Sequence, residues 1–280
     1  MTSVQTYRRP SSLEEAWRQL NEGGKSAKLV GGGIDVALYT SPETSTLIDL
    51  ALLPTRAIEW QNDGLAVGSG VTLTELLESP LAADYLDGIV VSMLRQVASP
   101  LLRNAATVGG TLVSTHPWSD VITLFVALDA RVTQYAGALD TQPLIELLKQ
   151  RGTMDRAIIT EVKLPAPEGR TLVGFEKFVR TGFDVAMLNF ACLLTIEDDI
   201  CTAARIVFGG TPDIAHRLVE VEETLLGSSL DSETVEAAGT LAAEMLPARD
   251  DIRASAAYRR ILAGAGVRRC LHRIVKGLGE

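Results

Sequence analysis

The stretch Arg103-Asn104-Ala105-Ala106-Thr107-Val108-Gly109-Gly110-Thr111-Leu112 places two adjacent glycines between an apolar approach and a small, polar exit. Glycine pairs let the backbone come close to a ligand and turn several N–H groups to one side. Such groups suit an anion, typically a phosphate. The same pattern also fits a tight loop between two elements. Taken alone, the stretch does not decide between these two interpretations.

A second glycine run lies nearer the N-terminus. A short strand predicted over 27–30 runs into Gly31-Gly32-Gly33, and a helical turn is predicted to begin at Ile34. Strand, glycine loop and helix in this order are the usual geometry of phosphate binding. The run is neither a Walker A loop nor a GxGxxG motif. Together the two runs could hold one pyrophosphate from two sides, which favours a dinucleotide over a free phosphate.

Asp120 comes ten residues after Gly110, directly behind a predicted helix cap at Ser119. Its carboxylate could bond a ribose hydroxyl or an adenine amine, or it could simply stabilise the first turn of a helix over 120–128. His116 beside Asp120 could be drawn as a catalytic dyad. No serine or cysteine sits in a recognisable nucleophile elbow, so hydrolase chemistry is a minor alternative.

Composition and charge exclude several classes of protein. The chain has 280 residues, of which 46% are hydrophobic and 22% charged, so we expect a packed core and room for two domains. A net charge of −9 without a basic groove makes nucleic-acid binding improbable. No apolar run approaches the length of a membrane span, and the polar start is followed by no signal core. We therefore expect a cytoplasmic protein.

The few cysteines and histidines restrict the redox chemistry. Cys192, Cys201 and Cys270 show no CxxC spacing, and three thiolates cannot ligate an iron–sulfur cluster by the usual scheme. The three histidines are far apart in the sequence, so no zinc site is expected. Redox chemistry in this chain would need an organic cofactor.

Residues 165–169 are predicted to form a linker, because two prolines and a glycine occur within these five residues. Before it, Asn62-Asp63-Gly64 predicts a β-hairpin. After it, successive strands and then helices predict a compact α+β domain with a three-stranded antiparallel sheet. The strands are predicted over 172–179, 189–196 and 203–208, and the helices over about 214–225, 233–245 and 254–274.

Five blocks of the sequence, in order, match a known family. Residues 103–111 followed by Pro117-Trp118-Ser119-Asp120 resemble the second FAD loop of the molybdenum hydroxylases, roughly R-N-x-A-T-x-G-G-N/S and then P-x-x-D. Residues 28–35 resemble the first FAD loop, usually A-G-G-T-D or A-G-G-H-S. The similarity covers nearly the whole chain. The further blocks are Phe175-Glu176-Lys177 with Phe183-Asp184-Val185-Ala186, Ala204 to Gly210, and Asp251 to Arg259.

This resemblance implies the FAD-binding, medium subunit of an oxidoreductase of the xanthine dehydrogenase or carbon monoxide dehydrogenase type. The implied fold is α+β. An FAD-binding domain of the vanillyl-alcohol oxidase (PCMH) type would span 1–167, in two subdomains split near residue 55. A smaller α+β domain would follow over 168–280.

The resemblance also implies partners. Substrate would be hydroxylated at a molybdenum cofactor in a large subunit, and electrons would pass through 2Fe-2S clusters of a small subunit to FAD and then to an external acceptor. The complex would be a dimer of heterotrimers. Two alternatives remain open: a flavin-less scaffold subunit of the same complex, and a stand-alone flavin oxidase.

The family's FAD residues carry over to particular positions here. The pyrophosphate would be bound, largely by backbone N–H groups, by Gly31, Gly32, Gly33, Ile34, Asp35, Thr107, Gly109, Gly110 and Thr111. Asp120 would contact the ribityl, ribose or adenine part of FAD, and Lys177 the flavin or its ribityl chain. Val185 and Ile159 would lie near the ring. Departures from the family pattern are Ile34 for Thr, Ser or His, Thr111 for Asn, Val185 for an aromatic, and the bulky Trp118.

Overall fold

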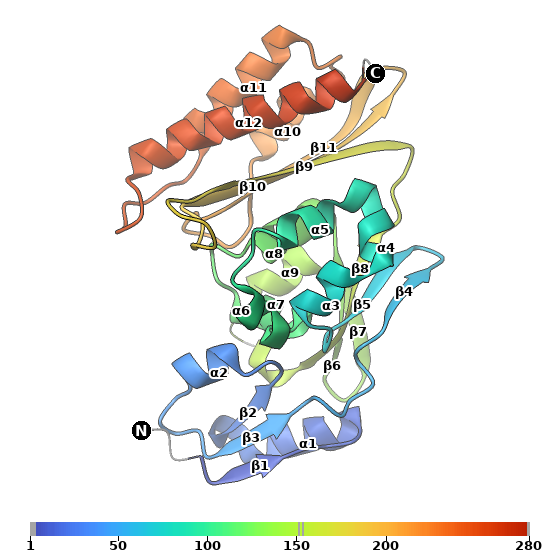
Figure 1. Cartoon of the computed structure of the whole chain (residues 1–280), viewed down its shortest axis with the longest axis vertical. Coiled ribbons are helices and arrows are strands. Elements are labelled where there is room, and N and C mark those ends of the chain that lie inside the picture. Colours follow the sequence, from blue (N-terminus) through green and yellow to red (C-terminus); the bar gives the residue numbers. More distant parts are fainter. Residues whose placement is uncertain (1–3, 151, 153, 279–280) are drawn as a thin grey trace. The chain divides into compact units, whose positions relative to one another are not determined.

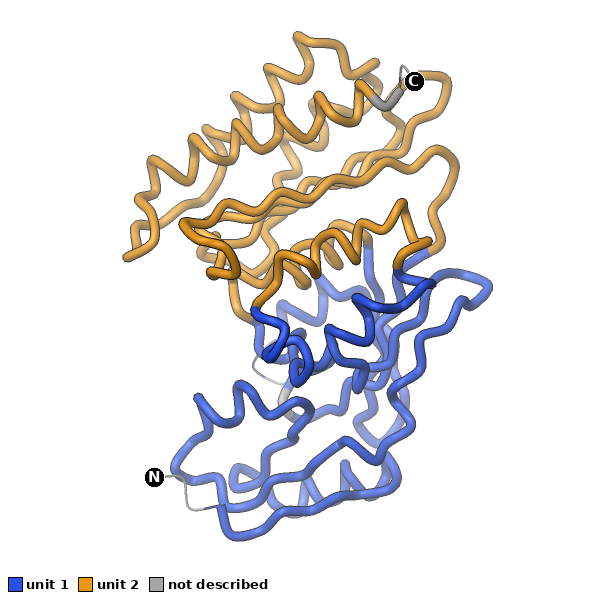
Figure 2. Tube along the Cα trace, in the orientation of Figure 1, with its two compact units in different colours: residues 1–82, 99–115, 129–165 blue, residues 83–98, 116–128, 166–280 orange. Residues whose placement is uncertain are grey.

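The two structural units of the protein are not consecutive in the sequence (Figure 2). The computed structural model describes residues 4–150, 152 and 154–278. Two internal segments, 83–98 and 116–128, pack with the C-terminal part of the chain rather than with their sequence neighbours. The predicted division at residue 167 stays a prediction. Unit 1 comprises 1–82, 99–115 and 129–165, and unit 2 comprises 83–98, 116–128 and 166–280.

Unit 1 begins with a small parallel sheet in the order β1-β3-β2. Helix α1 (Leu13–Gly23) packs on it through Ala16 and Leu20. Ser12 caps this helix, because its hydroxyl oxygen accepts the Glu15 N–H at 3.2 Å. The strand β1 was not predicted. The strands are β1 (Thr6–Arg8), β2 (Ala27–Val30) and β3 (Thr46–Asp49); the turn η1 (Gly24–Ser26) precedes β2, and α2 (Ile34–Tyr39) follows it.

A five-stranded antiparallel sheet, in the order β4-β5-β8-β6-β7, forms the second part of unit 1. The predicted hairpin is confirmed, since Gln61 pairs with Gly64 across a two-residue turn. The strands are β4 (Ile58–Gln61), β5 (Gly64–Gly68), β6 (Arg131–Tyr135), β7 (Leu139–Pro143) and β8 (Ile158–Pro165). The helices of this part are α3 (Leu73–Glu78), α6 (Pro100–Ala105), α7 (Val108–Ser114), α9 (Leu144–Lys149) and the turn η3 (Met154–Arg156).

Unit 2 is built on an antiparallel sheet of four strands, in the order β12-β11-β10-β9. The three predicted strands are present, but the prediction missed the fourth, because residues 214–217 were expected to be helical. Arg217 is held extended instead: its guanidinium bonds Glu222, whose Oε1 also accepts the Ile206 N–H of β11 at 2.9 Å. The strands are β9 (Arg170–Phe178), β10 (Leu188–Glu197), β11 (Ile200–Gly209) and β12 (His216–Arg217).

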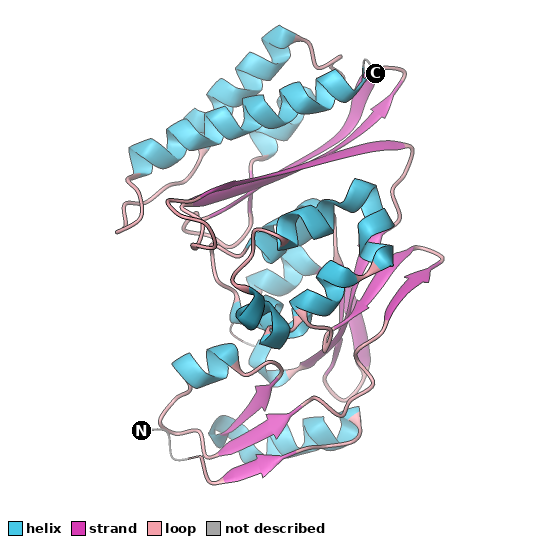
Figure 3. Ribbon diagram, viewed as in Figure 1, coloured by secondary structure: helices cyan, strands magenta, loops and turns pink. Residues whose placement is uncertain are grey.

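Helices cover both faces of this sheet (Figures 1 and 3). On one face, the C-terminal helices and the sheet enclose an apolar cluster that includes Phe190 and Phe208. On the other face lies α8 (Asp120–Ala127), every residue of which is buried. The remaining helices are α4 (Pro80–Asp84), η2 (Tyr85–Gly88), α5 (Ile89–Leu94), α10 (Val219–Leu225), α11 (Ser232–Met245) and α12 (Ala256–Leu278).

Among the described residues, no helix is long and apolar enough to cross a membrane. The same residues contain no group of three His, Cys, Asp or Glu side chains placed to hold a metal ion.

Candidate functional site

The two glycine runs lie side by side in unit 1. Gly31–Gly33 connects β2 to α2, and the turn Ala106-Thr107 connects α6 to α7. A Cβ on Gly31 would lie 2.6 Å from Thr107 Oγ1, and a Cβ on Gly32 would lie 1.7 Å from the Ala105 carbonyl oxygen. Only glycine permits this approach, since real Cβ atoms do not come so close to other atoms. The Gly31–Gly33 run is therefore packed directly against residues 105–107, which precede Gly109-Gly110.

The stretch predicted as a glycine loop is instead a helix start. Thr107 is the N-cap of α7, and its Oγ1 accepts the Gly110 N–H at 3.1 Å. The Gly109 N–H donates to the Ser69 carbonyl oxygen at 2.8 Å, and the Thr111 N–H to that of Thr107 at 2.9 Å. In this structure these N–H groups bond within the fold, so any contact of this stretch with a ligand would rest on close approach rather than on free donors.

Gly31, Gly32 and Gly33 differ in this respect. Within the described part of the chain, their N–H groups donate to no protein acceptor. Gly33 has a left-handed φ of 76° and precedes the first residue of α2, so the loop turns directly into a helix N-terminus. Free N–H groups at such a terminus favour an anion. Gly31–Gly33 thus has the backbone donors that a pyrophosphate needs.

The adjacent glycines Gly109 and Gly110 have different surroundings. Gly109 is buried, and a Cβ there would lie 2.7 Å from Ser69 Cβ. Gly110 is exposed, and the closest atom to a Cβ there would be Thr107 Oγ1 at 2.9 Å. Packing therefore explains Gly109. Gly110 leaves an open backbone surface that a ligand can approach closely.

The remaining predicted residues of unit 1 lie on two elements. Ile34 and Asp35 open α2, where the Asp35 carboxylate favours the positive helix end. Ile34 offers no side-chain donor at this position. Ile159 is on β8, is 6% exposed and pairs with Gln134 of β6. The structure thus brings Gly31–Gly33 next to Thr107, at the start of the segment Thr107–Thr111, and places Ile159 on the five-stranded sheet.

In unit 2 the structure joins two predicted residues directly. Asp120, the first residue of α8, lies 2.7 Å from the Lys177 ammonium through its Oδ2. Both side chains are buried, at 6% and 4% exposure. Lys177 also donates to the Gln96 carbonyl oxygen at 2.8 Å. The two residues, assigned to FAD separately by resemblance, form a buried ion pair.

A third residue, Asn189, completes this cluster and was not predicted. Its amide nitrogen donates to Asp120 Oδ1 at 2.6 Å and to the Trp118 carbonyl oxygen at 3.1 Å. Burial raises the pKa of Asp120; the Lys177 charge and the hydrogen bonds from Lys177 and Asn189 oppose that rise without cancelling it. The available signal for Asn189 was a single amide within the apolar run 185–196.

Val185 lies in the connection between β9 and β10, half-buried, with its N–H donating to Asp184 Oδ1 at 2.8 Å. Trp118, the bulky departure from the family pattern, is accommodated by stacking. Its ring lies 4.9 Å from the His116 ring, and the Arg253 guanidinium lies 4.8 Å from its centroid. Trp118 is thus held by neighbours of unit 2.

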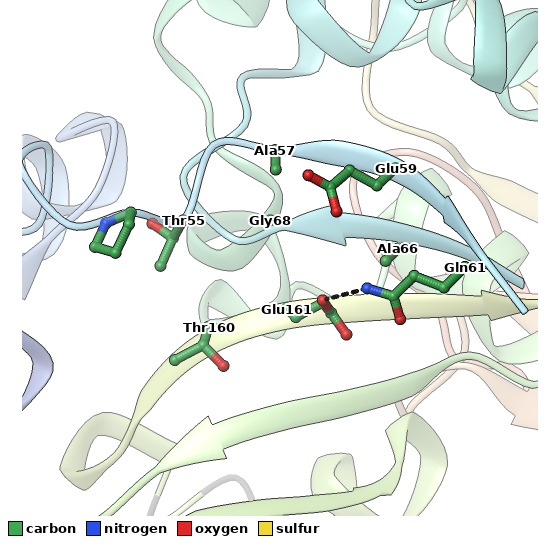
Figure 4. Close-up of a pocket in the computed structure, with 9 residues that line it drawn as sticks. Thr55, Ala57, Glu59, Gln61, Ala66, Gly68, Thr160 and Glu161 are labelled. Atoms are coloured by element: carbon green, nitrogen blue, oxygen red, sulfur yellow. Dashed lines mark hydrogen bonds between the residues drawn. The ribbon is translucent and has the colours of Figure 1, made fainter. Parts of the chain in front are cut away.

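A cavity of about 70 Å³ in unit 1 is a poor candidate for the cofactor site (Figure 4). Its lining includes Thr55, Glu59, Gln61 and Glu161, with Gln61 donating to Glu161 at 3.4 Å. Among the described residues that line it, none is a predicted FAD residue. The cavity is also far smaller than the several hundred Å³ of typical cofactor pockets.

Comparison with known proteins identifies the family of the chain. The family model described as the FAD binding domain in molybdopterin dehydrogenase matches residues 2–167, and that of the CO dehydrogenase flavoprotein C-terminal domain matches residues 174–274. Among relatives, the 6-hydroxypseudooxynicotine dehydrogenase complex subunit alpha of Paenarthrobacter nicotinovorans is 28% identical over 94% of this chain and 93% of its own. The carbon monoxide dehydrogenase medium chain of Hydrogenophaga pseudoflava is 27% identical over 95% of both chains.

Solved structures give the same answer for the fold. Quinoline 2-oxidoreductase from Pseudomonas putida 86 matches with a TM-score of 0.88 and 26% identity over 99% of both chains. Carbon monoxide dehydrogenase from Hydrogenophaga pseudoflava matches with a TM-score of 0.88 and 25% identity over 97% of both chains. The predicted fold class is confirmed. This chain therefore belongs to the molybdopterin dehydrogenase FAD-binding family and is an FAD-binding medium subunit of the carbon monoxide dehydrogenase type.

Proposed function

We propose that this chain carries the FAD of a molybdenum-containing hydroxylase or dehydrogenase complex and passes electrons through it. The observation that carries the proposal is the Gly31–Gly33 backbone before α2, whose N–H groups meet no acceptor among the described residues. Gly31 in this run packs against Thr107, the N-cap of α7. Backbone N–H donors can bind a diphosphate without cationic side chains, and this suits a chain whose net charge is negative. Exposed Gly110 adds a surface that the same phosphates can approach.

The proposed roles of the residues follow from their surroundings. The backbone from Gly31 to Asp35 would bind the pyrophosphate, and Thr107, Gly109, Gly110 and Thr111 would shape the opposite wall. This wall would act through close approach, since its N–H groups are already bonded. When bound, FAD supplies reversible storage of electrons. The protein's task is to hold and orient it.

In unit 2, Asp120 would accept a hydrogen bond from a hydroxyl or amine of FAD. Both of its oxygens already have donors, yet each carboxylate oxygen retains a second lone pair. Lys177 would lie on the flavin or ribityl side, where its charge is balanced by Asp120. Val185 and Ile159 would offer apolar contact near the ring.

The proposal extends to the complex. Relatives are named as medium chains and complex subunits, so we propose a large subunit with the molybdenum cofactor and a small subunit with 2Fe-2S clusters as partners. A dimer of heterotrimers, an external electron acceptor and a cytoplasmic location belong to the same proposal. Mass measurement of the purified complex, with its metal and flavin content, tests the assembly, and cell fractionation tests the location.

Substitution of Gly110 tests the FAD site. Gly110→Glu puts bulk and negative charge on the open surface and should abolish the flavin absorption of the purified protein. Gly152→Glu is the matched control, because a Cβ at that exposed glycine meets nothing within 4 Å. A folded wild-type chain without FAD in a denatured extract would count against the proposal. A complex with molybdenum but no FAD would favour the scaffold alternative.

A further inference from the structure

Asn189 stands at the centre of a cross-strand row that the sequence did not single out. In the register of the sheet, Asn189 of β10 is paired with Lys177 of β9 and with Gly209 of β11. The three positions therefore lie in line on the face that α8 covers, and the first residue of that helix is Asp120. Asn189 itself is 0% exposed. A fully buried amide must have its hydrogen bonds satisfied inside the protein.

Every polar group of the Asn189 side chain is used. Its amide nitrogen donates to Asp120 Oδ1 and to the Trp118 carbonyl oxygen, and its Oδ1 lies 2.9 Å from the Thr123 hydroxyl, which donates to it. Rotating the amide by half a turn would put its oxygen against a carboxylate and a carbonyl oxygen. The orientation of the amide is therefore determined by its surroundings.

Gly209 leaves the space for this arrangement. A Cβ at position 209 would lie 2.2 Å from Asn189 Oδ1 and 2.3 Å from Thr123 Oγ1. The network and the glycine are thus built to fit one another. Nothing in the local backbone explains a glycine at this strand position, since its φ is not left-handed.

The network connects two parts of the chain that are matched by different family models. Asp120 and Thr123 fall within the matched FAD-binding region, and Lys177 and Asn189 within the matched C-terminal region. The groups facing the carboxylate are the Lys177 ammonium from β9 and the Asn189 amide from β10. His116 and Arg253 lie nearby, both stacked on the Trp118 ring.

We propose that Asn189 is a positioning residue: it holds the Asp120 carboxylate oriented and charged beside Lys177, and so sets how well that carboxylate can receive FAD. The effect on FAD binding rests on the proposed function. Lys177 supplies the counter-charge through Oδ2, but it bonds one oxygen only. The Asn189 amide donates to the other oxygen and also to the Trp118 carbonyl oxygen. The two bonds together fix the orientation of the carboxylate. A charged carboxylate accepts hydrogen bonds, whereas a protonated one also donates.

The first test needs no FAD. The protonated carboxyl of Asp120 is followed by infrared absorption during a pH titration of the full chain, with Asp120→Asn as the blank. Losing the Asn189 hydrogen bond in Asn189→Ala should raise the midpoint of this titration by about one pH unit. Cys192→Ala is the control, since Cys192 is equally buried on the same strand but faces the opposite side, toward Cys270. An unchanged midpoint in Asn189→Ala overturns the inference.

The second test measures FAD affinity of the same variants by titration of flavin-depleted chain. Asn189→Ala should weaken binding about tenfold or more, roughly the loss of one charge-assisted hydrogen bond, and should weaken it no further in the Asp120→Asn background. Gly209→Ala, which crowds Asn189 without removing it, should weaken binding in the same direction. Cys192→Ala should leave it unchanged.

The two tests separate the inference from the proposed function. An equal loss of affinity in the wild-type and Asp120→Asn backgrounds shows that Asn189 does not act through Asp120, and this overturns the inference while the proposed function stands. A wild-type chain that binds no FAD overturns the proposed function. In that case the carboxyl titration alone decides whether Asn189 holds the carboxylate.

Discussion

Replacing Lys177 by methionine tests how much the buried ion pair stabilises the protein. The Nζ–Oδ2 separation is 2.7 Å, so the attraction amounts to about 6 kcal/mol at an effective dielectric constant of 20. Most of this offsets the desolvation of the two groups. Removing one partner leaves the other charge buried and unpaired, and the cost of that is about 3–5 kcal/mol. For a chain of this size we expect the melting temperature to fall by roughly 10 °C.

Thermal unfolding of the full chain without FAD gives the measurement, and two further variants make it specific. Arg18→Met is the matched control, because the Arg18–Glu22 pair is 66% and 62% exposed and should contribute less than about 0.5 kcal/mol. In the double variant Lys177→Met/Asp120→Asn both charges are gone. This variant should recover at least half of the lost stability, since no unpaired charge remains.

Two results would refute this reasoning. If Lys177→Met lowered the melting temperature no more than Arg18→Met, the ion pair would not be desolvated. If the double variant were less stable than the wild type by the sum of the two single-variant effects, the two side chains would act independently. Either outcome would also remove Lys177 as the counter-charge of Asp120.

Three more changes have defined outcomes. Gly32→Ala should cost more than about 3 kcal/mol of unfolding free energy in denaturant melts, because its Cβ would meet the Ala105 carbonyl oxygen at 1.7 Å; Gly152→Ala should be silent. Gly174→Ala should lower the melting temperature, since its Cβ would lie 2.1 Å from Cys270 Sγ, and adding Cys270→Ala should restore it. Burial raises the pKa of Asp251, but the Arg259 hydrogen bond and two backbone N–H donors outweigh it and lower the pKa to about 2. A carboxyl group whose pKa is lower in the folded than in the unfolded protein stabilises the fold at neutral pH, and this contribution is lost as the pH falls from about 4 to 2. Asp251→Asn should therefore remove about 1–2 kcal/mol of acid-dependent stability. Urea unfolding at a series of pH values measures it. A pH dependence identical to wild type would contradict this last assignment.

Local signals predicted the elements that depend on neighbouring residues. The Ser119 cap, the Asn62-Asp63 hairpin and the strand-to-helix passage at Gly31–Gly33 all occur as expected. Each is decided within a few residues by turn or capping chemistry. The two-residue strand β12 depends on Glu222, which bonds Arg217 five residues away and also accepts the Ile206 N–H of β11. The contact with β11 leaves no trace in the sequence around β12.

The site was predicted as a set of positions but not as a geometry. Glycine pairing indicated an anion site, yet the sequence could not show that the N–H groups of Gly109 and Thr111 bond within the fold. It could not pair Asp120 with Lys177 either, since the two are 57 residues apart and meet only when α8 packs on the sheet through β10 and β11. The contact of Asn189 with Asp120 could not be predicted for the same reason.

Helix α8 has a consequence for how this protein can be cut and recombined. It lies inside the region matched by the FAD-binding family model, yet all eight of its residues are buried against the sheet that follows residue 167. A fragment ending at 167 would expose this apolar helix, together with the carboxylate at its start, and should aggregate. A chimera that takes residues 168–280 from a relative must carry a matching Lys and Asn, so the two halves of this gene are expected to change together.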